Sequence, residues 1–375
     1  MAPQKMLDRP IRWEAEDSSR ARTVVVGLLA DPGLPSEIAA QLAEELPTML
    51  ADQPRDGMRY TFTVVEETLR RRGDARGERL IDLAAERRAR EGWDFVICLT
   101  DLPVHKDGRP VVAELSRDAG VGLLVVPALK VLNPVEQARD IAAGLILEWS
   151  ARDPLEEPLQ RLEDRVRSLH RVEPDDDDID LQLATSAGHL QMLVGMVRVN
   201  RPWRLVLGLR GALAAALATA AFGLVNEPVW QVSGAMSTLR LWIATVVSLA
   251  AMTSWLILNH GLWQHPRVDD RREHRRIRLY NAATLLTLAI GLLVSYAVLF
   301  VGNFLTGWFA VVPQVFSTAI GRPAAVADYV RLAWLVSSLA TIGGALGSGL
   351  ESTDTVRSAT WGTRYRQAGR RRRNT

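Results

Sequence analysis

The run LWIATVVSLAAMTSWLIL, residues 241–258, contains no charged side chain, and it decides the fold of this chain. Similar apolar runs occupy residues 205–225, 282–301 and 330–350. A helix that crosses the hydrocarbon core of a membrane needs about 20 predominantly apolar residues. In lipid, a spanning segment must also satisfy its own backbone hydrogen bonds, as a helix does. The runs therefore predict an all-α four-helix transmembrane bundle within residues 203–350.

Arginines predict the orientation of these four spans. The segment between the second and third runs is rich in arginine, as is the tail at 351–375, whereas the other two connections carry almost none. Basic residues are retained on the cytoplasmic side. We therefore expect a multi-pass protein of the inner (plasma) membrane, with both termini cytoplasmic and anionic lipid headgroups as partners. The middle-loop arginines that carry this topology prediction are Arg271, Arg272, Arg275 and Arg276.

Three features inside the runs add detail. Arg210 is the only charge well inside a predicted span, and its long side chain can reach the cytoplasmic headgroups. The alternative is a functional charge that faces the bundle interior, as a transporter would require. Gly343 and Gly347 lie one helical turn apart and predict close helix packing. Residues 303–320 are apolar but contain Gly307 and Pro313, so we interpret them as an extracytoplasmic interfacial segment.

Composition bounds the rest of the chain. A length of 375 residues suggests two or three units. The single cysteine, Cys98, excludes an intrachain disulfide and fits a reducing cytoplasm. Residues 1–22 are polar, resemble a flexible arm and show no signal-peptide core. Basic loops beside membrane spans are better explained by topology than by nucleic acid, so no nucleic-acid partner is expected.

Residues 23–152 predict a cytosolic α/β domain. Apolar or β-branched runs at 23–30, 60–65, 93–100 and 121–127 are typical of strands, and 111–115 is interpreted as an edge strand. Helical spacing after Ser36, at 78–90 and at 134–149 places helices between them. Strands that alternate with helices indicate an α/β fold with a partly parallel sheet.

Residues 153–202 are expected to join the two parts. Apolar residues at 155–169 follow a heptad spacing, which indicates either a single amphipathic helix or a stalk that forms a homo-oligomer. Residues 173–180 are an acidic run and a predicted hinge. Residues 181–199 are interpreted as an amphipathic helix that lies at the membrane surface or docks beneath the bundle.

Sequence motifs for chemistry are sparse. We find no dinucleotide, phosphate-loop, nucleophile-elbow or zinc-protease motif, and predict no cofactor and no metal. The histidines of the middle loop, beside Asp269 and Asp270, are interpreted as part of a solvated basic loop. Asp31 follows the first strand, and Thr100 and Asp101 end the third, where α/β domains place ligand-binding groups. They are the catalytic or ligand-binding candidates; the alternative is that both aspartates cap turns.

A family resemblance concerns the same region. The strand at 93–100, its Thr100-Asp101-Leu102 end and the strand and loop at 122–129 resemble the archaemetzincin layout. In that family the next helix carries zinc ligands. The corresponding helix here, 134–148, contains no histidine, so the resemblance implies a fold over about residues 23–150 without the zinc chemistry. The whole chain also resembles uncharacterised actinobacterial membrane proteins with a cytosolic N-terminal domain and four spans.

Three functions remain open. The first is a non-enzymatic or regulatory membrane protein with a ligand- or partner-binding α/β domain. The second is a membrane-tethered enzyme with its site near Asp31 and Asp101. The third is a transporter-like bundle that uses Arg210.

Overall fold

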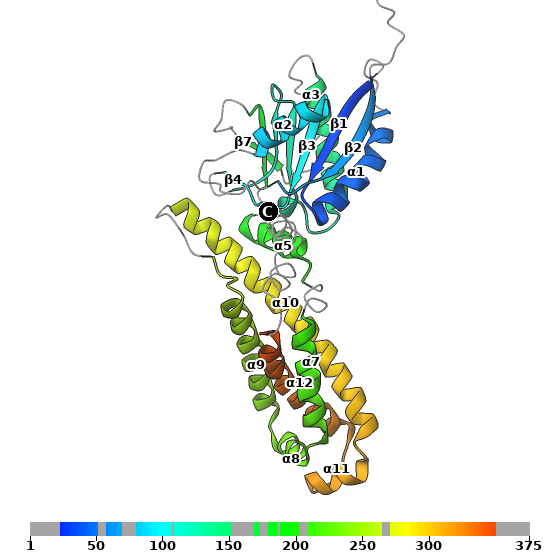
Figure 1. The fold of residues 1–375 in the computed structure, drawn as a ribbon, viewed down its shortest axis with the longest axis vertical. Coiled ribbons are helices and arrows are strands. Elements are labelled where there is room, and N and C mark those ends of the chain that lie inside the picture. The colour runs from blue at the N-terminus through cyan, green and yellow to red at the C-terminus, as the bar shows by residue number, and fades with distance from the viewer. Residues whose placement is uncertain are drawn as a thin grey trace, which may run out of the picture.

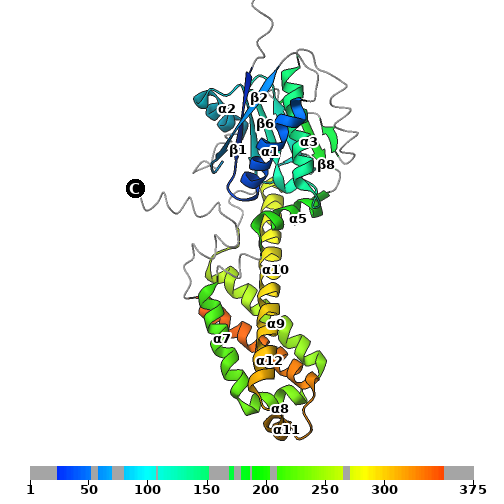
Figure 2. The same ribbon diagram turned by 90° about the vertical axis from the view of Figure 1, so that its right-hand side faces the viewer.

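The computed structural model has an α/β domain, followed by a region of long helices (Figures 1 and 2). The arm at 1–22, the tail at 351–375, the acidic residues 173–178 and the heptad before Leu169 lie outside the part that the structure describes. The described residues are 23–51, 58–69, 80–106, 109–151, 169–172, 179–185, 188–202, 209–264 and 271–349.

One mixed sheet organises the α/β domain, with the strand order β2-β1-β3-β6-β5-β8-β7 and β4 paired to β5. Strands β2, β1, β3 and β6 run parallel, whereas β5, β8 and β7 pair antiparallel. The elements of this domain are β1 (Thr23–Ala30), α1 (Leu34–Ala51), β2 (Arg59–Glu66), α2 (Leu80–Glu91), β3 (Phe95–Thr100), β4 (His105–Lys106), β5 (Arg109–Ser116), β6 (Val121–Val125), η1 (Val126–Ala128), α3 (Pro134–Ser150), β7 (Leu169–Val172), β8 (Leu181–Thr185) and α5 (Gly188–Asn200).

Burial explains the parallel centre of the sheet. Every residue of β3 and β6 is buried, as expected for strands covered on both faces. Helices α1 and α3 contact each other, and α2 packs against β3 and β6. A side chain at Gly27 would place its Cβ 2.0 Å from the Trp93 ring, so glycine lets the indole lie on β1.

Two predictions for this domain are wrong. β5 is not an edge strand, because β8 pairs with its outer side through registers such as Glu114↔Gln182. Residues assigned to the connecting helices instead extend the sheet: Leu169, the last position of the heptad pattern, begins β7, and 181–185 form β8. The predicted juxtamembrane helix is therefore shorter and corresponds to α5. Strands β7 and β8 form because β5 offers an unpaired edge, which no local pattern reveals.

The helical region contains α7 (Arg210–Val225), α8 (Glu227–Ala235), α9 (Thr238–Asn259), α10 (Arg271–Ala310), α11 (Pro313–Ile320) and α12 (Val326–Ser348). Three helices, α9, α10 and α12, are long and apolar enough to cross a membrane. Helices α7 and α8 bend by 83° and make a fourth span only if they are counted as one. Asn226 and Pro228 explain that break, because proline is favoured in the first turn of a new helix.

Helix α10 differs most from its predicted span at 282–301. It continues for 40 residues, which corresponds to about 60 Å, twice the hydrocarbon thickness. Its first turns reach the α/β domain in both views (Figures 1 and 2). Its last turns also take up residues 303–310, which the prediction assigned to a separate interfacial segment; of that segment, only α11 is a separate short helix.

Candidate functional site

Asp31 joins three segments at the carboxyl edge of the parallel strands. Its side chain is 2% exposed. One carboxylate oxygen accepts from the Thr100 hydroxyl at 2.8 Å and from the Asp101 backbone N–H at 3.2 Å. The other accepts from the Leu69 backbone N–H at 3.1 Å, on the segment after β2. The carboxylate therefore ties together the ends of β1, β2 and β3.

The structure thus brings Asp31, Thr100 and Asp101 together, as the strand ends suggested. They lie where the chain order reverses: β2 is on one side of β1 and β3 on the other, the place at which doubly wound sheets bind ligands. The hydrogen bonds of Asp31 agree with the turn-capping interpretation of that residue. Asp101 is 2% exposed and Thr100 is fully buried.

Helix α5 covers the same edge of the sheet. A Cβ at Gly195 would lie 2.0 Å from the carbonyl oxygen of Pro127, so α5 and η1 are in close contact. Gln191 donates to the Ala128 carbonyl at 3.1 Å. Arg201, just after α5, pairs with Glu37 in the first turn of α1. The edge that carries the candidate residues therefore faces the long helices, as Figure 1 shows.

Helix α10 completes this junction. Ala283, 1% exposed, belongs to the apolar core of the α/β domain, and Leu279 and Tyr280 pack against that core. Leu288 and Leu292 belong instead to a core of the helical region. One unbroken helix thus contributes to both cores.

Cys98 lies mid-strand in β3 and is fully buried. Burial, with a smaller contribution from the charge of Asp31, raises the pKa of its thiol well above the ordinary value. A buried, protonated thiol is a poor nucleophile, so Cys98 acts as a small core residue. In the described part of the chain, no three His, Cys, Asp or Glu side chains are grouped closely enough to hold a metal ion.

The topology residues lie at the domain-facing end of the helices. Arg210 is the first residue of α7, and residues 203–208, which include the start of the predicted span, lie outside the described part. Arg271, Arg272, Arg275 and Arg276 all lie on the first turns of α10.

Gly343 and Gly347 lie where α12 packs against α7. A Cβ at Gly343 would lie 2.1 Å from the Thr219 hydroxyl oxygen. At Gly347 it would lie 2.4 Å from the Ala215 Cβ and 2.6 Å from a backbone oxygen of α7. Both glycines therefore permit an approach that any larger residue would prevent.

A buried polar network joins α9, α10 and α12. The Trp334 indole donates to the Thr245 hydroxyl at 2.7 Å. The Tyr296 hydroxyl lies 3.1 Å from that of Thr245 and 3.0 Å from that of Ser338. Two turns after Tyr296 on α10, Asn303 donates to Ser337 at 3.0 Å. These bonds satisfy polar groups inside an apolar region, which is how such groups fix helix pairings in lipid.

An apolar pocket lies beside this network. Three hydroxyl groups line it, and all three bond within the helices: Ser295 to Gly291, Thr341 to Ser337 and Tyr296 to Trp334. The pocket therefore presents an apolar wall to any occupant.

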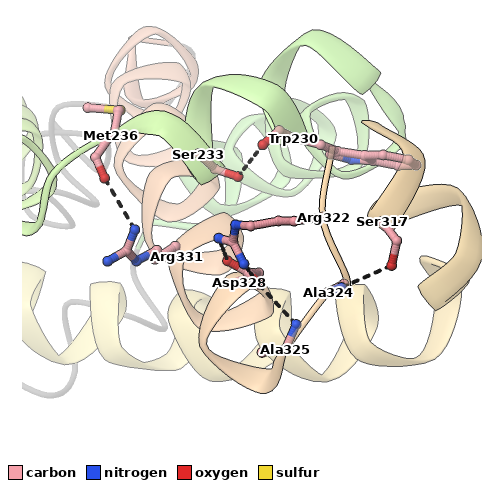
Figure 3. A network of polar contacts seen from close by, with 9 residues as sticks. All are labelled: Trp230, Ser233, Met236, Ser317, Arg322, Ala324, Ala325, Asp328 and Arg331. Carbon is pink, nitrogen blue, oxygen red and sulfur yellow. Dashed lines mark hydrogen bonds and ion pairs between the residues drawn. The ribbon is translucent and has the colours of Figure 1, made fainter. Parts of the chain in front are cut away.

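A second polar cluster closes the far end of the helices (Figure 3). Asp328 on α12 is 2% exposed and receives two hydrogen bonds from Arg322, at 2.9 and 2.5 Å. The Ala325 backbone N–H adds a third at 2.9 Å. Arg331 reaches back to the carbonyl oxygen of Met236, after α8, at 3.5 Å. A bidentate pair of this kind fixes the loop between α11 and α12.

Sequence reasoning missed both of these polar clusters. Asp328 and Arg331 lie at the edge of the fourth apolar run, and their three-residue spacing, one helical turn, is the only local signal. Comparison with protein-family models, with curated proteins and with solved structures gives no match.

Proposed function

We propose that this chain is a multi-pass membrane protein whose α/β domain binds a ligand or partner and is coupled, through α5 and α10, to a four-helix transmembrane bundle. One observation carries the proposal. Ala283 in one core and Leu288 in the other lie five residues apart on an unbroken helix. A change in the domain's packing therefore has a direct route to the helices, which supports a regulatory or anchoring role.

A helix breaker between the two cores tests the coupling. Leu285 lies between them and is 45% exposed, so its replacement disturbs little packing. In nanodiscs, we expect the wild-type domain and helices to lose hydrogen-exchange protection together, and Leu285→Pro to separate the two transitions. Leu285→Ala is the matched control. Separate transitions already present in the wild type would contradict coupling.

The orientation is a second part of this proposal. We place the N-terminal domain, the middle loop and the tail in the cytoplasm because the arginine-rich segments of the sequence flank the same ends of the predicted spans. On a Cys98→Ser background, Arg90→Cys should react with an impermeant maleimide only in permeabilised cells. Gln314→Cys on α11 should react in intact cells. The reverse labelling pattern would show that the N-terminal domain lies on the opposite side of the membrane.

The enzyme hypothesis rests on a separate observation: Thr100 and Asp101 are buried where the strand order reverses. If a ligand or substrate binds there, Asp101→Ala should fold normally and lose it. Native mass spectrometry from mild detergent measures this as a bound mass that Asp101→Ala no longer carries. An identical bound mass in the variant would count against this edge as the site.

A further inference from the structure

Exposed large apolar side chains are few in the described part of the α/β domain, and they are unevenly placed. Before Arg210, the described residues of this kind are Val64, Val131, Leu132 and Leu190. Val64 is only 37% exposed, whereas Leu132 is 82% and Leu190 is 72% exposed. The two most exposed lie on the η1–α3 connection and on α5, at the edge that faces the long helices.

Leu132 is held outward by a defined loop. The Lys130 backbone N–H donates to the Gln137 side chain at 2.6 Å, and Arg198 on α5 donates to the Val131 carbonyl at 2.7 Å. Asn133 follows with a φ of 54°, in the left-handed region, before α3 begins. These constraints fix the turn on both sides of Leu132, so its exposure is built into the backbone.

The level of α5 along α10 places this loop near a bilayer surface. Asn200, the last residue of α5, donates to the Thr287 hydroxyl at 3.2 Å. Thr287 lies inside the apolar part of α10, which begins at Ile277. The segment after α9 carries Trp263, 45% exposed, beside Gln264, whose backbone exchanges two 3.0 Å hydrogen bonds with the side chain of Asn281, less than two turns from Thr287 on α10. Exposed tryptophans of this kind mark a membrane interface.

We propose that the Lys130–Val131–Leu132 loop and Leu190 form an interfacial membrane contact of the α/β domain. Leu132 and Leu190 enter the headgroup region of the domain-side leaflet, and the exposed Lys130 meets anionic headgroups. The proposed contact is continuous in sequence with the membrane helices, because α7 begins ten residues after α5 ends. This contact rests on the membrane placement of α9, α10 and α12, and it adds a second attachment that holds the strand-end edge against the lipid.

Fluorescence in nanodiscs tests the contact in the full-length protein. On a Cys98→Ser background, Leu132→Cys carries an environment-sensitive dye, and the lipids carry a nitroxide near the headgroup end of the acyl chain. We expect quenching about twofold or more above that of Arg90→Cys, an exposed position on α2. Equal quenching at the two positions would overturn the proposal.

Two further experiments separate the membrane placement of the helices from the contact made by the loop. Val298→Cys, at a 58% exposed position well inside the apolar part of α10, should be quenched by deep nitroxides whatever the loop does; if it is not, the membrane placement itself fails. Adding phosphatidylglycerol to phosphatidylcholine discs should increase the quenching at position 132, and Lys130→Gln should remove that increase. An increase that survives Lys130→Gln would overturn the electrostatic part of the contact.

Discussion

In the α/β domain the fully buried side chains include Phe95, Ile97 and Leu28, whereas the buried face of α12 is mostly Ala, Gly, Ser and Thr. The exposed surfaces of the two regions differ in the opposite sense. The helices present residues such as Phe309, 91% exposed, and Leu258, 81% exposed, while the domain exposes very few large apolar groups in its described part. A protein in water would not leave so many apolar side chains uncovered.

The reversal follows from the solvent. Water drives large apolar side chains into the domain core. Lipid tails are as apolar as leucine, so helices in a membrane gain little from burying such groups and associate through close packing and hydrogen bonds. Loss of buried core contacts should therefore destabilise the α/β domain, and loss of close packing or interhelical hydrogen bonds should destabilise the helices.

The largest effect is expected for the close packing of α12 on α7. Gly347→Leu would force a side chain into a space where even its Cβ lies 2.6 Å from a backbone oxygen. We expect a loss of about 3 kcal/mol or more of stability. Thermal unfolding in nanodiscs measures it. Gly302→Leu, where a Cβ meets nothing within 4 Å, is the control and should leave the transition unchanged.

The next effect is on the domain. Asp31→Ala leaves the Thr100 hydroxyl and the Leu69 and Asp101 backbone N–H groups without this acceptor. The cost is about 3 kcal/mol. Because Cys98 is buried beside this site, its alkylation by iodoacetamide should become about 100-fold faster. Asp118→Ala, at an exposed carboxylate, should alkylate like the wild type; if the two variants agree, Asp31 is not a structural tie.

A smaller effect is expected within α9. The hydroxyls of Thr245 and Thr253 both donate to the carbonyl four residues earlier, but only Thr245 also accepts from Trp334. We expect Thr245→Val to cost about 1 kcal/mol more than Thr253→Val. Steric trapping or mild denaturation in detergent measures the difference. Equal costs would show that the network does not hold α9 to α12.

The smallest effect concerns pH. The folded pKa of Cys98 lies above the unfolded value of 9.0, so the thiol's contribution is fully present below pH 9 and is lost as pH rises through the folded pKa. We expect the domain to be less stable by about 1 kcal/mol near pH 9.5 than at pH 8 from this group. Chemical unfolding at both values measures it, and Cys98→Ala should remove this part of the dependence.

Local patterns were sufficient where one segment decides its own structure. The strand at 23–30 matches β1, and the run at 241–258 lies within α9. The common edge of Asp31 and Thr100 could also be predicted, because parallel strands end at one edge of a sheet. Strand β8 could not be predicted, since its register depends on β5, some 70 residues earlier.

The long helix α10 shows a different limit. Its arginine-rich first turns lowered the hydropathy and concealed a helix that contains no proline from Arg271 to Ala310. The only local signal that this part of α10 is packed is the four-residue spacing of the apolar residues Leu279 and Ala283. The junction itself depends on tertiary contacts, such as Asn200 with Thr287, that sequence spacing does not encode.

The length of α10 also makes it a lever. Its length of about 60 Å is about twice the thickness of a hydrocarbon core, so about half of it lies outside the core when the helix spans a membrane. A spanning helix adapts to a thinner bilayer by tilting. A tilt of about 10° would displace the end of a 30 Å extension by about 5 Å, more than a hydrogen bond can follow. Arg201, next to α5, is paired with Glu37 on α1, so that displacement would transmit force to the strand-end edge of the α/β domain. The packing of this domain would therefore depend on membrane thickness.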